Sequence, residues 1–307
     1  MIFSSGYLIP MNNSGNFQRQ GFWKKRSLGQ NFLINPHIVS RVVSAAKITK
    51  NDTIVEVGPG LGNLTQKLAE KSKKVIAIEK DSRLISILKN NLSNYGNVDI
   101  IEGDILKIDT FTLLPPTTAS YKIVANIPYY ITSHFLRKIF VSRSKASGEL
   151  APQLVILTIQ KEVAQRIMAR PPHMNLLALS IQYYSTPEII SYISKNNFRP
   201  IPKVDSAIIR LISRSKASGN TDNIYTSRSL ASGSTPGEGL GGETEELFKL
   251  MRLGFSEKRK QLASVLSKKL KIDKEKILES FQKEGIAPKA RAENLSLEQW
   301  QKLSKIL

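Results

Sequence analysis

Hydrophobic residues recur along this chain in two patterns, continuous apolar runs and stretches with apolar residues three or four positions apart. The continuous runs predict buried strands, and the spaced stretches predict helices with one face in a core. The predicted strands are residues 53–57, 74–78, 98–101, 121–125 and 154–158. The predicted helices begin near residues 36, 64, 82, 132, 160 and 177.

Strands and helices alternate through this part of the chain. Such alternation is typical of a parallel sheet, because each helix carries the chain back to the edge where the next strand starts. Two of the helix starts also have capping signals, Asn35 before Pro36 and Asp81 before the helix that contains Leu84 and Leu88. We therefore predict an α/β fold whose parallel sheet is covered by helices on both faces.

Composition divides the chain into segments. Residues 1–23 are polar and predict a flexible extension, and residues 24–212 hold the alternating elements. Residues 213–244 are rich in Gly, Ser and Thr and predict a flexible linker. Residues 245–307 combine spaced leucines with basic residues, which predicts a small helical domain.

A heptapeptide, Ser-Arg-Ser-Lys-Ala-Ser-Gly, occurs twice in the chain. It spans residues 142–148 and 213–219, and residues 227–233 repeat it with Leu230 in place of Lys. The copies start 71 and then 14 residues apart, which is no solenoid period. We interpret them as inserted loops, with an insertion at about 142–150; the alternative is that their Arg and Lys side chains contact nucleic acid.

The chain is strongly basic. It has 45 Lys and Arg against 25 Asp and Glu, a net charge of +20 over 307 residues. This excess favours a polyanionic partner, although a merely soluble basic protein is the alternative. Cysteine is absent and the three histidines are scattered, so we expect no disulfide and no metal site. No apolar run is long enough to span a bilayer, and we expect a cytoplasmic protein.

A glycine-rich turn, Gly58-Pro59-Gly60-Leu61-Gly62, follows a predicted strand and opens a predicted helix. Such a turn lets a ligand approach backbone N–H groups. Its spacing differs from the dinucleotide pattern, and an acidic residue, Glu56, lies inside the preceding strand. We therefore favour a nucleoside cofactor without a pyrophosphate.

Carboxylates close the next two strands. Glu79 can accept both hydroxyls of a ribose that lies on the glycine turn, and Asp104 can accept an adenine amino hydrogen. Ligands in open α/β sheets bind at the carboxyl ends of strands. Two carboxylates at these positions are therefore better explained by one shared ligand than as unrelated surface residues. The pattern predicts S-adenosylmethionine as the cofactor.

The fourth strand ends in Asn126-Ile127-Pro128-Tyr129. This turn offers an amide, backbone carbonyls and an aromatic ring, because proline supplies no N–H. Those groups could hold a flat base, although an ordinary strand-to-loop turn is the alternative. An amide oxygen and a carbonyl that accept the hydrogens of an exocyclic amine would orient it for methylation without a strong base.

With these four strand ends the chain resembles the ribosomal RNA adenine dimethyltransferases, and in particular the small-subunit branch of that family. The resemblance runs from about residue 25 to residue 307, and it implies a Rossmann-like class I S-adenosylmethionine-dependent methyltransferase sheet with a small C-terminal helical domain. Further motifs that carry it are residues 28–33 (LGQNFL), 160–164 (QKEVA), 198–207 (FRPIPKVDSA) and 255–262 (FSEKRKQL). Two departures from the family's usual sequence are the loop at 170–176 and Ile201, where proline is common.

The resemblance also implies roles for individual residues. Phe198 is expected to face Tyr129 across the target base, although a core aromatic is the alternative for Phe198. The expected catalytic residues are Asn126, Ile127, Pro128, Tyr129 and Phe198. The expected cofactor-binding residues are Asn31, Leu33, Gly58, Gly60, Glu79, Asp104 and Asn126. The expected RNA-binding residues are Lys24, Lys25, Arg26, Lys203, Lys258, Arg259 and Lys260.

The implied reaction is transfer of methyl groups to the N6 amines of two adjacent adenines in the 3′-terminal hairpin of 16S rRNA. The implied partner is an assembling 30S particle, and we expect a monomer. One alternative is a resistance-type 23S rRNA adenine methyltransferase, and another is an assembly factor that binds RNA without catalysis. The net charge and the Asn-Ile-Pro-Tyr sequence disfavour a protein or small-molecule methyltransferase.

Overall fold

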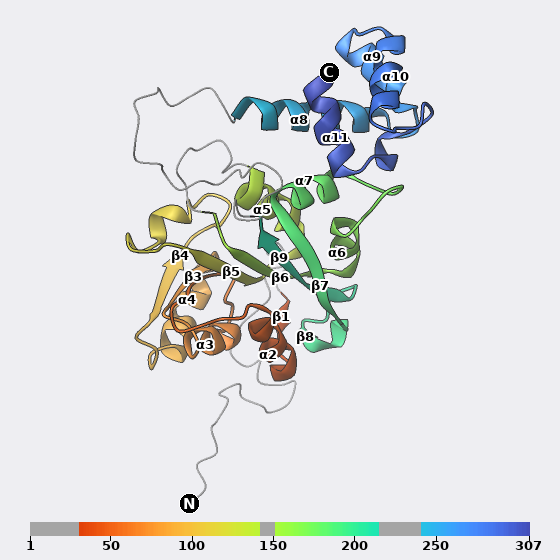
Figure 1. Ribbon diagram of the computed structural model, residues 1–307. Helices are drawn as coiled ribbons and strands as arrows, with labels where there is room; N and C mark the ends of the chain where they lie inside the picture. Colours follow the sequence, from red (N-terminus) through yellow and green to blue (C-terminus); the bar gives the residue numbers. More distant parts are fainter. Residues whose placement is uncertain (1–30, 142–150, 215–240) are drawn as a thin grey trace, which may run out of the picture.

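The computed structural model describes residues 31–141, 151–214 and 241–307. Within these ranges a seven-stranded sheet has the order β4-β3-β2-β5-β6-β9-β7 (Figure 1). Its five parallel strands lie within two residues of the predicted ones. They are β2 (Thr53–Val57), β3 (Lys74–Glu79), β4 (Val98–Glu102), β5 (Tyr121–Asn126) and β6 (Leu154–Gln160). The α/β fold class is thus confirmed.

Several sequence-based expectations lie outside the described residues. They concern the extension at 1–23, the basic residues Lys24, Lys25 and Arg26, the insertion at 142–150, and most of the linker.

One edge of the sheet differs from the prediction. Strands β9 (Ser206–Ser213) and β7 (Ser185–Ile193) continue the sheet beyond β6, and both pairings are antiparallel. The expectation of a wholly parallel sheet is therefore wrong at this edge. Strand β7 has a weak signal because it is an edge strand with Pro187 and exposed polar residues, as edge strands commonly have.

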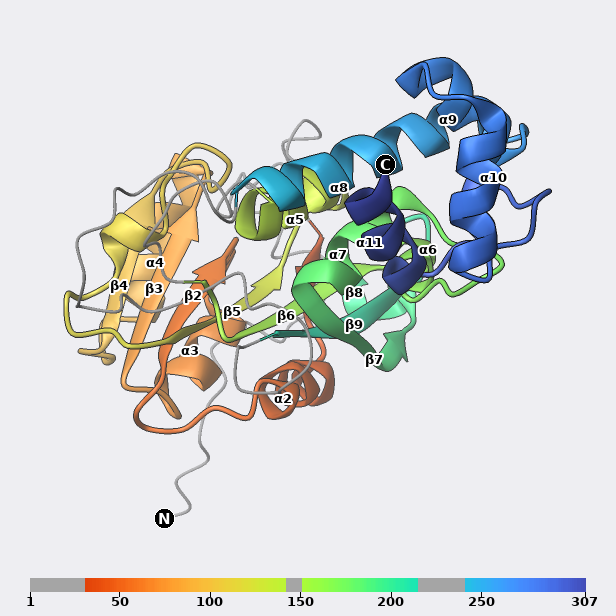
Figure 2. The same ribbon diagram turned by 45° about the horizontal axis from the view of Figure 1, so that its top comes forward.

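Two hydrophobic clusters lie on opposite faces of the sheet, because successive side chains of a strand point in opposite directions. Val55 and Val57 face one cluster, together with α5 (Thr132–Leu136) and α7 (Leu176–Tyr184). Ile54 faces the other cluster. Three helices cover that face, α2 (Pro36–Ala45), α3 (Asn63–Ala69) and α4 (Ser82–Asn91). The layers are visible in Figure 2.

The helix starts bear out the capping signals. The side chain of Asn35 accepts a hydrogen bond from the His37 backbone N–H at 2.9 Å, and Pro36 is the first residue of α2. Asp81 Oδ1 accepts from the Arg83 backbone N–H at 3.3 Å at the start of α4. These bonds satisfy N–H groups that have no partner within the helix.

The C-terminal helices form a group beside α7 (Figure 2). They are α8 (Gly241–Gly254), α9 (Leu262–Leu270), α10 (Lys274–Lys283) and α11 (Leu297–Ile306). Helix α8 begins at Gly241, so it includes four residues that the sequence assigned to the linker. The helical periodicity becomes visible only at Leu247, because two glycines and a polar stretch precede it.

Aromatic side chains join these helices to the sheet domain. The ring of Phe248 on α8 lies 5.3 Å from the ring of Tyr183 and 5.7 Å from that of Tyr184, both on α7. The hydroxyl groups of Tyr183 and Thr244 share a hydrogen bond of 3.0 Å. One hydrophobic cluster therefore extends from the sheet into the C-terminal helices. No helix in the described ranges combines the length and apolar composition that a membrane crossing requires.

Replacement of Phe248 by alanine tests this shared core. We expect Phe248→Ala to lower the free energy of unfolding by about 3–5 kcal/mol, because it removes a buried aromatic ring and leaves a cavity. Urea denaturation followed by circular dichroism measures the change. Arg252→Ala, an exposed position on the same helix, is the matched control. A loss no larger than that of the control would contradict the shared core.

Candidate active site

The carboxyl ends of four neighbouring strands, β4, β3, β2 and β5, meet at one pocket. Gly58 follows β2, Glu79 ends β3, Asp104 follows β4 and Asn126 ends β5. The pocket is lined by Asn31, Phe32, Val57, Gly58, Gly60, Ile78, Glu79, Lys80, Gly103, Asp104, Ile105, Asn126, Ile127, Pro128, Tyr129, Tyr130 and Ile131. It therefore brings together every predicted cofactor-binding residue except Leu33.

The glycine turn requires glycine for two reasons. Gly58, Gly60 and Gly62 have φ angles of +69°, +63° and +89°, a region that other residues rarely adopt. A Cβ atom on Gly60 would also lie 2.9 Å from two ring carbons of Phe32. A side chain larger than hydrogen is therefore strained at all three positions, and at Gly60 it also meets the Phe32 ring.

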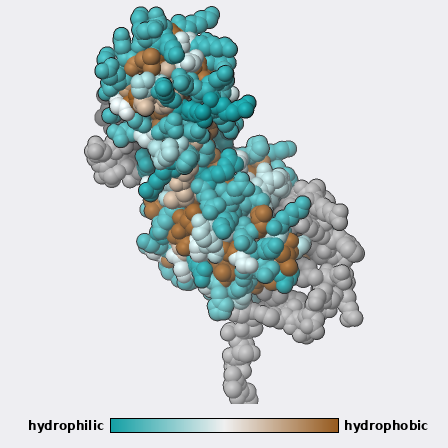
Figure 3. Space-filling view, turned by 90° about the vertical axis from the view of Figure 1, so that its right-hand side faces the viewer, coloured by the Kyte–Doolittle hydropathy of each residue, from teal (hydrophilic) through white to brown (hydrophobic). Residues whose placement is uncertain are grey.

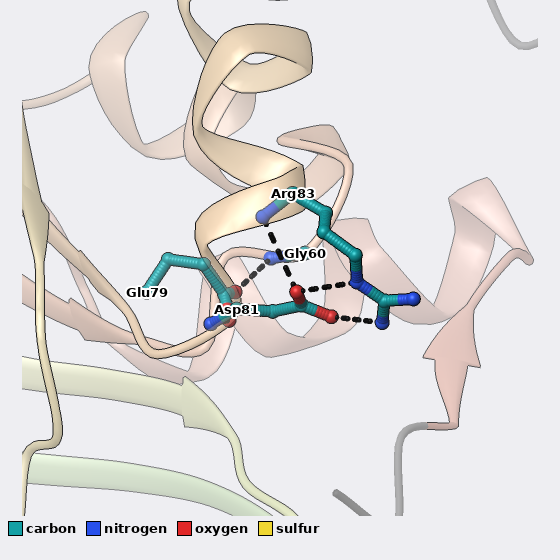
Figure 4. A network of polar contacts seen from close by, with 4 residues as sticks. All are labelled: Gly60, Glu79, Asp81 and Arg83. Atoms are coloured by element: carbon teal, nitrogen blue, oxygen red, sulfur yellow. Dashed lines mark hydrogen bonds and ion pairs between the residues drawn. The ribbon is translucent and has the colours of Figure 1, made fainter. Parts of the chain in front are cut away.

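Glu79 is fixed between the glycine turn and the start of α4 (Figure 4). Its Oε2 accepts from the Gly60 N–H at 3.2 Å, and its Oε1 accepts from the Asp81 N–H at 2.8 Å. Arg83 in turn donates to Asp81 at 2.8 and 2.5 Å. Burial raises the pKa of Glu79, although these backbone hydrogen bonds act in the opposite direction. The carboxylate is thus oriented by the protein itself.

Asp104 is held in a similar way. Its Oδ1 accepts from the Leu106 N–H at 3.0 Å, and its Oδ2 accepts from Lys80 Nζ at 2.8 Å. Partial burial raises the pKa of Asp104, but the hydrogen bonds from Lys80 and Leu106 outweigh that effect and hold the pKa below its usual value. The sequence did not single out Lys80, whose only signal is its place directly after Glu79.

The turn after β5 is also anchored. Asn126 Nδ2 donates to the backbone carbonyl of Asn31 at 2.9 Å. This bond uses the amide nitrogen and not the amide oxygen, Oδ1, which is an acceptor. The Tyr129 hydroxyl shares a hydrogen bond of 2.6 Å with Ser206 Oγ. Burial raises the pKa of Tyr129. Both side chains line the pocket.

A two-stranded ribbon brings the first described residues to the pocket. Strand β1 (Phe32–Leu33) pairs antiparallel with β8 (Phe198–Arg199), opposite residues being Phe32 with Arg199 and Leu33 with Phe198. This pairing places Asn31 and the ring of Phe32 at the pocket, while the Leu33 side chain is buried in a hydrophobic cluster. Leu33 therefore does not line the pocket, and Phe32 is, like Lys80, a lining residue that the sequence did not single out.

A family profile described as ribosomal RNA adenine dimethylase matches residues 21–231. The chain belongs to this family. It is 38% identical over 279 residues to a protein from Dehalococcoides mccartyi named ribosomal RNA small subunit methyltransferase A, covering 91% of this chain and 87% of the relative. A protein of the same name from Bacillus pumilus is 35% identical over 306 residues, covering 97% and 96% of the two chains.

Two solved structures share the fold of this family member. A dimethyladenosine transferase from Plasmodium falciparum is 27% identical with a TM-score of 0.68, over 89% of this chain and 95% of that one. The 23S rRNA methyltransferase ErmE is 23% identical with a TM-score of 0.68, over 90% and 99%. The second likeness shows the fold alone.

Phe198 occupies a different place from the expected one. Its ring has 0% exposure and packs in the cluster that contains Leu33, Ile193 and Ile208, and it does not line the pocket. In this conformation Phe198 is a core aromatic and cannot face Tyr129 across a base. The expectation overlooked the pairing of β8 with β1, which places Phe198 opposite Leu33.

The predicted RNA-binding residues within the described ranges lie at two places. Lys258, Arg259 and Lys260 are exposed in the turn before α9. Lys203 is exposed in the loop between β8 and β9. Among the described residues no group of three or more His, Asp or Glu side chains is placed to hold a metal ion.

Glu56, the acidic residue inside β2, is a buried ionisable group two residues before the glycine turn. It is 1% exposed within β2, and its Oε2 has no hydrogen-bond partner. Burial raises its pKa from 4.5 to about 8, and the nearby charge of Glu79 adds to the rise. Burial therefore favours the protonated form of this carboxyl in the folded protein.

Gly60→Ala tests the geometry of the turn. We expect it to lower the free energy of unfolding by about 2 kcal/mol or more, because alanine is strained at this φ and its Cβ meets the Phe32 ring. Thermal and urea denaturation measure the change. Gly96→Ala is the matched control, since a Cβ there has no neighbour within 4 Å. Equal stability of the two variants would contradict the close approach.

Glu56→Gln tests the buried carboxyl. Between pH 4.5 and about 8 the folded state holds the proton and the unfolded state releases it. The stability of the wild type should therefore fall, relative to the Gln variant, as pH rises through this window, by up to about 1.4 kcal/mol per pH unit. Urea denaturation from pH 5 to 8.5 measures the difference, and parallel curves would contradict the raised pKa.

Proposed function

We propose that this protein is an S-adenosylmethionine-dependent enzyme that forms N6,N6-dimethyladenosine at two adjacent adenines of small-subunit (16S) rRNA. The proposal includes the 3′-terminal hairpin as the target, an assembling 30S particle as the partner, and a cytoplasmic monomer as the working form. One observation carries it: a pocket suited to a nucleoside adjoins the Asn126–Tyr129 turn, which is suited to a flat base.

The pocket residues fit S-adenosylmethionine. The glycine turn borders the pocket through Gly58 and Gly60, which have no side chain to fill it. Glu79 would accept the ribose hydroxyls and Asp104 the adenine amine, since both carboxylates are already oriented toward the pocket by backbone hydrogen bonds. When bound, this cofactor supplies an electrophilic methyl group on a sulfonium.

Asn126 would orient the target amine. Because its Nδ2 is bonded to the Asn31 carbonyl, its Oδ1 is left to accept one N6 hydrogen, and the Ile127 carbonyl would accept the other. The lone pair of the N6 nitrogen is then directed at the methyl donor. The rate of methyl transfer therefore depends on how well the amine is positioned. The nitrogen becomes acidic as it is alkylated, so the displaced proton passes to water and no strong base is needed.

Tyr129 would hold the base by stacking. Its hydroxyl is bound to Ser206, so one orientation of the ring is maintained before RNA binds. Stacking of a base on an aromatic side chain contributes about 1–3 kcal/mol. Phe198 would stack on the opposite face of the base only after its ring had moved out of the core.

The 23S rRNA enzymes are the second candidate. The fold fits them equally well, because the likeness to ErmE has the same TM-score, 0.68, as the likeness to the dimethyladenosine transferase. The sequence favours the small subunit, since relatives with that name are 35–38% identical over nine-tenths of this chain or more.

Labelled methyl transfer distinguishes the candidates. The full chain is incubated with labelled S-adenosylmethionine and either small or large ribosomal subunits that lack the modification, and the RNA is digested to nucleosides. We expect labelled N6,N6-dimethyladenosine in small-subunit RNA alone. Label in large-subunit RNA alone would support the 23S alternative. Tight RNA binding without any label would support an assembly factor.

Substitutions in the turn separate positioning from binding. We expect Asn126→Ala to lower kcat by about 10²-fold or more, because an oriented acceptor is lost. Tyr129→Ala should lower turnover and leave cofactor affinity nearly unchanged, whereas Tyr129→Phe should retain most activity because the ring remains. Single-turnover assays and cofactor titration measure both quantities. Wild-type rates in Asn126→Ala, or equal loss of cofactor affinity in Tyr129→Ala, would contradict these roles.

A further inference from the structure

An open notch beside the candidate active site is lined by three lysines from separate elements. Lys161 begins α6 (Lys161–Ile167), Lys195 begins η6 (Lys195–Asn197), and Lys203 lies in the loop between β8 and β9. All three are exposed. Within the described part of the chain none of them makes an ion pair, so their charges are available to a ligand.

Asp205 holds the elements of the notch together. Its backbone carbonyl accepts from the Lys161 N–H at 3.0 Å, and its Oδ1 accepts from the Lys195 N–H at 3.0 Å. Asp205 and Glu162 also line the notch, so three positive charges face two negative ones. The Asp205 carboxylate orders the turn, and the three lysines still exceed the two carboxylates by one positive charge.

Tyr192 orients one of the lysines. Its ring is 50% exposed on β7, and Lys161 Nζ lies over that ring, 5.1 Å from the ring centre. A cation is attracted to the face of an aromatic ring, so this contact limits the positions of a long flexible side chain. Tyr192 thereby restricts the position of Lys161, the residue that lines the notch.

The notch adjoins the residues proposed to hold the target base. Tyr129 is bonded to Ser206, which directly follows Asp205, and Ser206 pairs with Gln160, which directly precedes Lys161. In Figure 1 the elements α6, β7 and β8 lie on the right-hand side of the molecule. Figure 3 looks onto that side, where hydrophobic groups are set among hydrophilic ones below the C-terminal helices.

We propose that this notch binds the phosphate backbone of the RNA strand that presents the adenine, and that Tyr192 is a positioning residue for Lys161. The proposal rests on the proposed function, because it names where the same RNA is held. A base taken out of its stack must be presented by a backbone that is fixed nearby, and ammonium groups bind phosphates as point charges. Lys203 was expected to bind RNA from the sequence; Lys161, Lys195 and Tyr192 are new.

A triple variant tests the notch. In the full chain, Lys161, Lys195 and Lys203 are replaced together by alanine. The matched control replaces Lys71, Lys73 and Lys89, which are exposed and lie away from the carboxyl ends of the strands, and so removes the same charge. Methyl transfer to unmethylated small subunits is measured at several salt concentrations. Thermal unfolding and S-adenosylmethionine titration check that both variants are folded.

We expect the notch variant to raise KM for the subunit at least 10-fold. Its slope of log(kcat/KM) against log salt should be shallower than that of the wild type by about 2, since each contact to a single-stranded phosphate contributes about 0.7. The control should keep a KM within about twofold of the wild type. Equal KM and equal slope in the two triple variants would overturn the RNA-binding role of the notch and leave the proposed function intact. Absence of transfer by the wild type would overturn the proposed function, and the notch with it.

Paired substitutions at Tyr192 test its positioning role. Tyr192→Leu should raise KM to the level of Lys161→Ala, and adding Lys161→Ala to it should cause little further change. Tyr192→Phe keeps the ring face and should restore the wild-type KM. A KM in Tyr192→Leu that equals the wild type, or a defect in Tyr192→Phe as large as that in Tyr192→Leu, would overturn this role.

Discussion

The parallel pairing of β2 with β3 on one side and β5 on the other is the constraint on which the site depends. Because neighbouring parallel strands end at the same edge of a sheet, groups far apart in the chain reach one place. Glu79 and Asn126 therefore flank the glycine turn that follows β2. All five residues of β2 are buried, including Glu56, so the strand cannot shift its register without exposing the core.

The polar groups of the pocket are oriented by the protein before any ligand binds. Glu79, Asp104, Asn126 and Tyr129 each have at least one hydrogen bond within the chain. A side chain that is already held loses little freedom on binding, so its interaction with a ligand is not offset by ordering. Chemistry that depends on positioning an amine is suited to such a site.

The antiparallel edge of the sheet connects this pocket to the rest of the surface. Strand β9 brings Ser206 to the Tyr129 hydroxyl and Asp205 to the start of α6. Beyond this edge, α8 packs its Phe248 against the tyrosines of α7, so the C-terminal helices have a defined position relative to the pocket.

The sequence by itself determined the five parallel strands, the helices that follow them and the residues at four strand ends, because hydrophobic periodicity and glycine turns are local signals. Local signals are weak where a segment is stabilised by distant partners. Strands β1 and β8 are two residues each and exist only through their pairing, so the burial of Phe198 and the place of Phe32 were decided by tertiary structure. The same holds for Lys161 and Tyr192, 31 residues apart, which meet because α6 packs beside the edge strand β7.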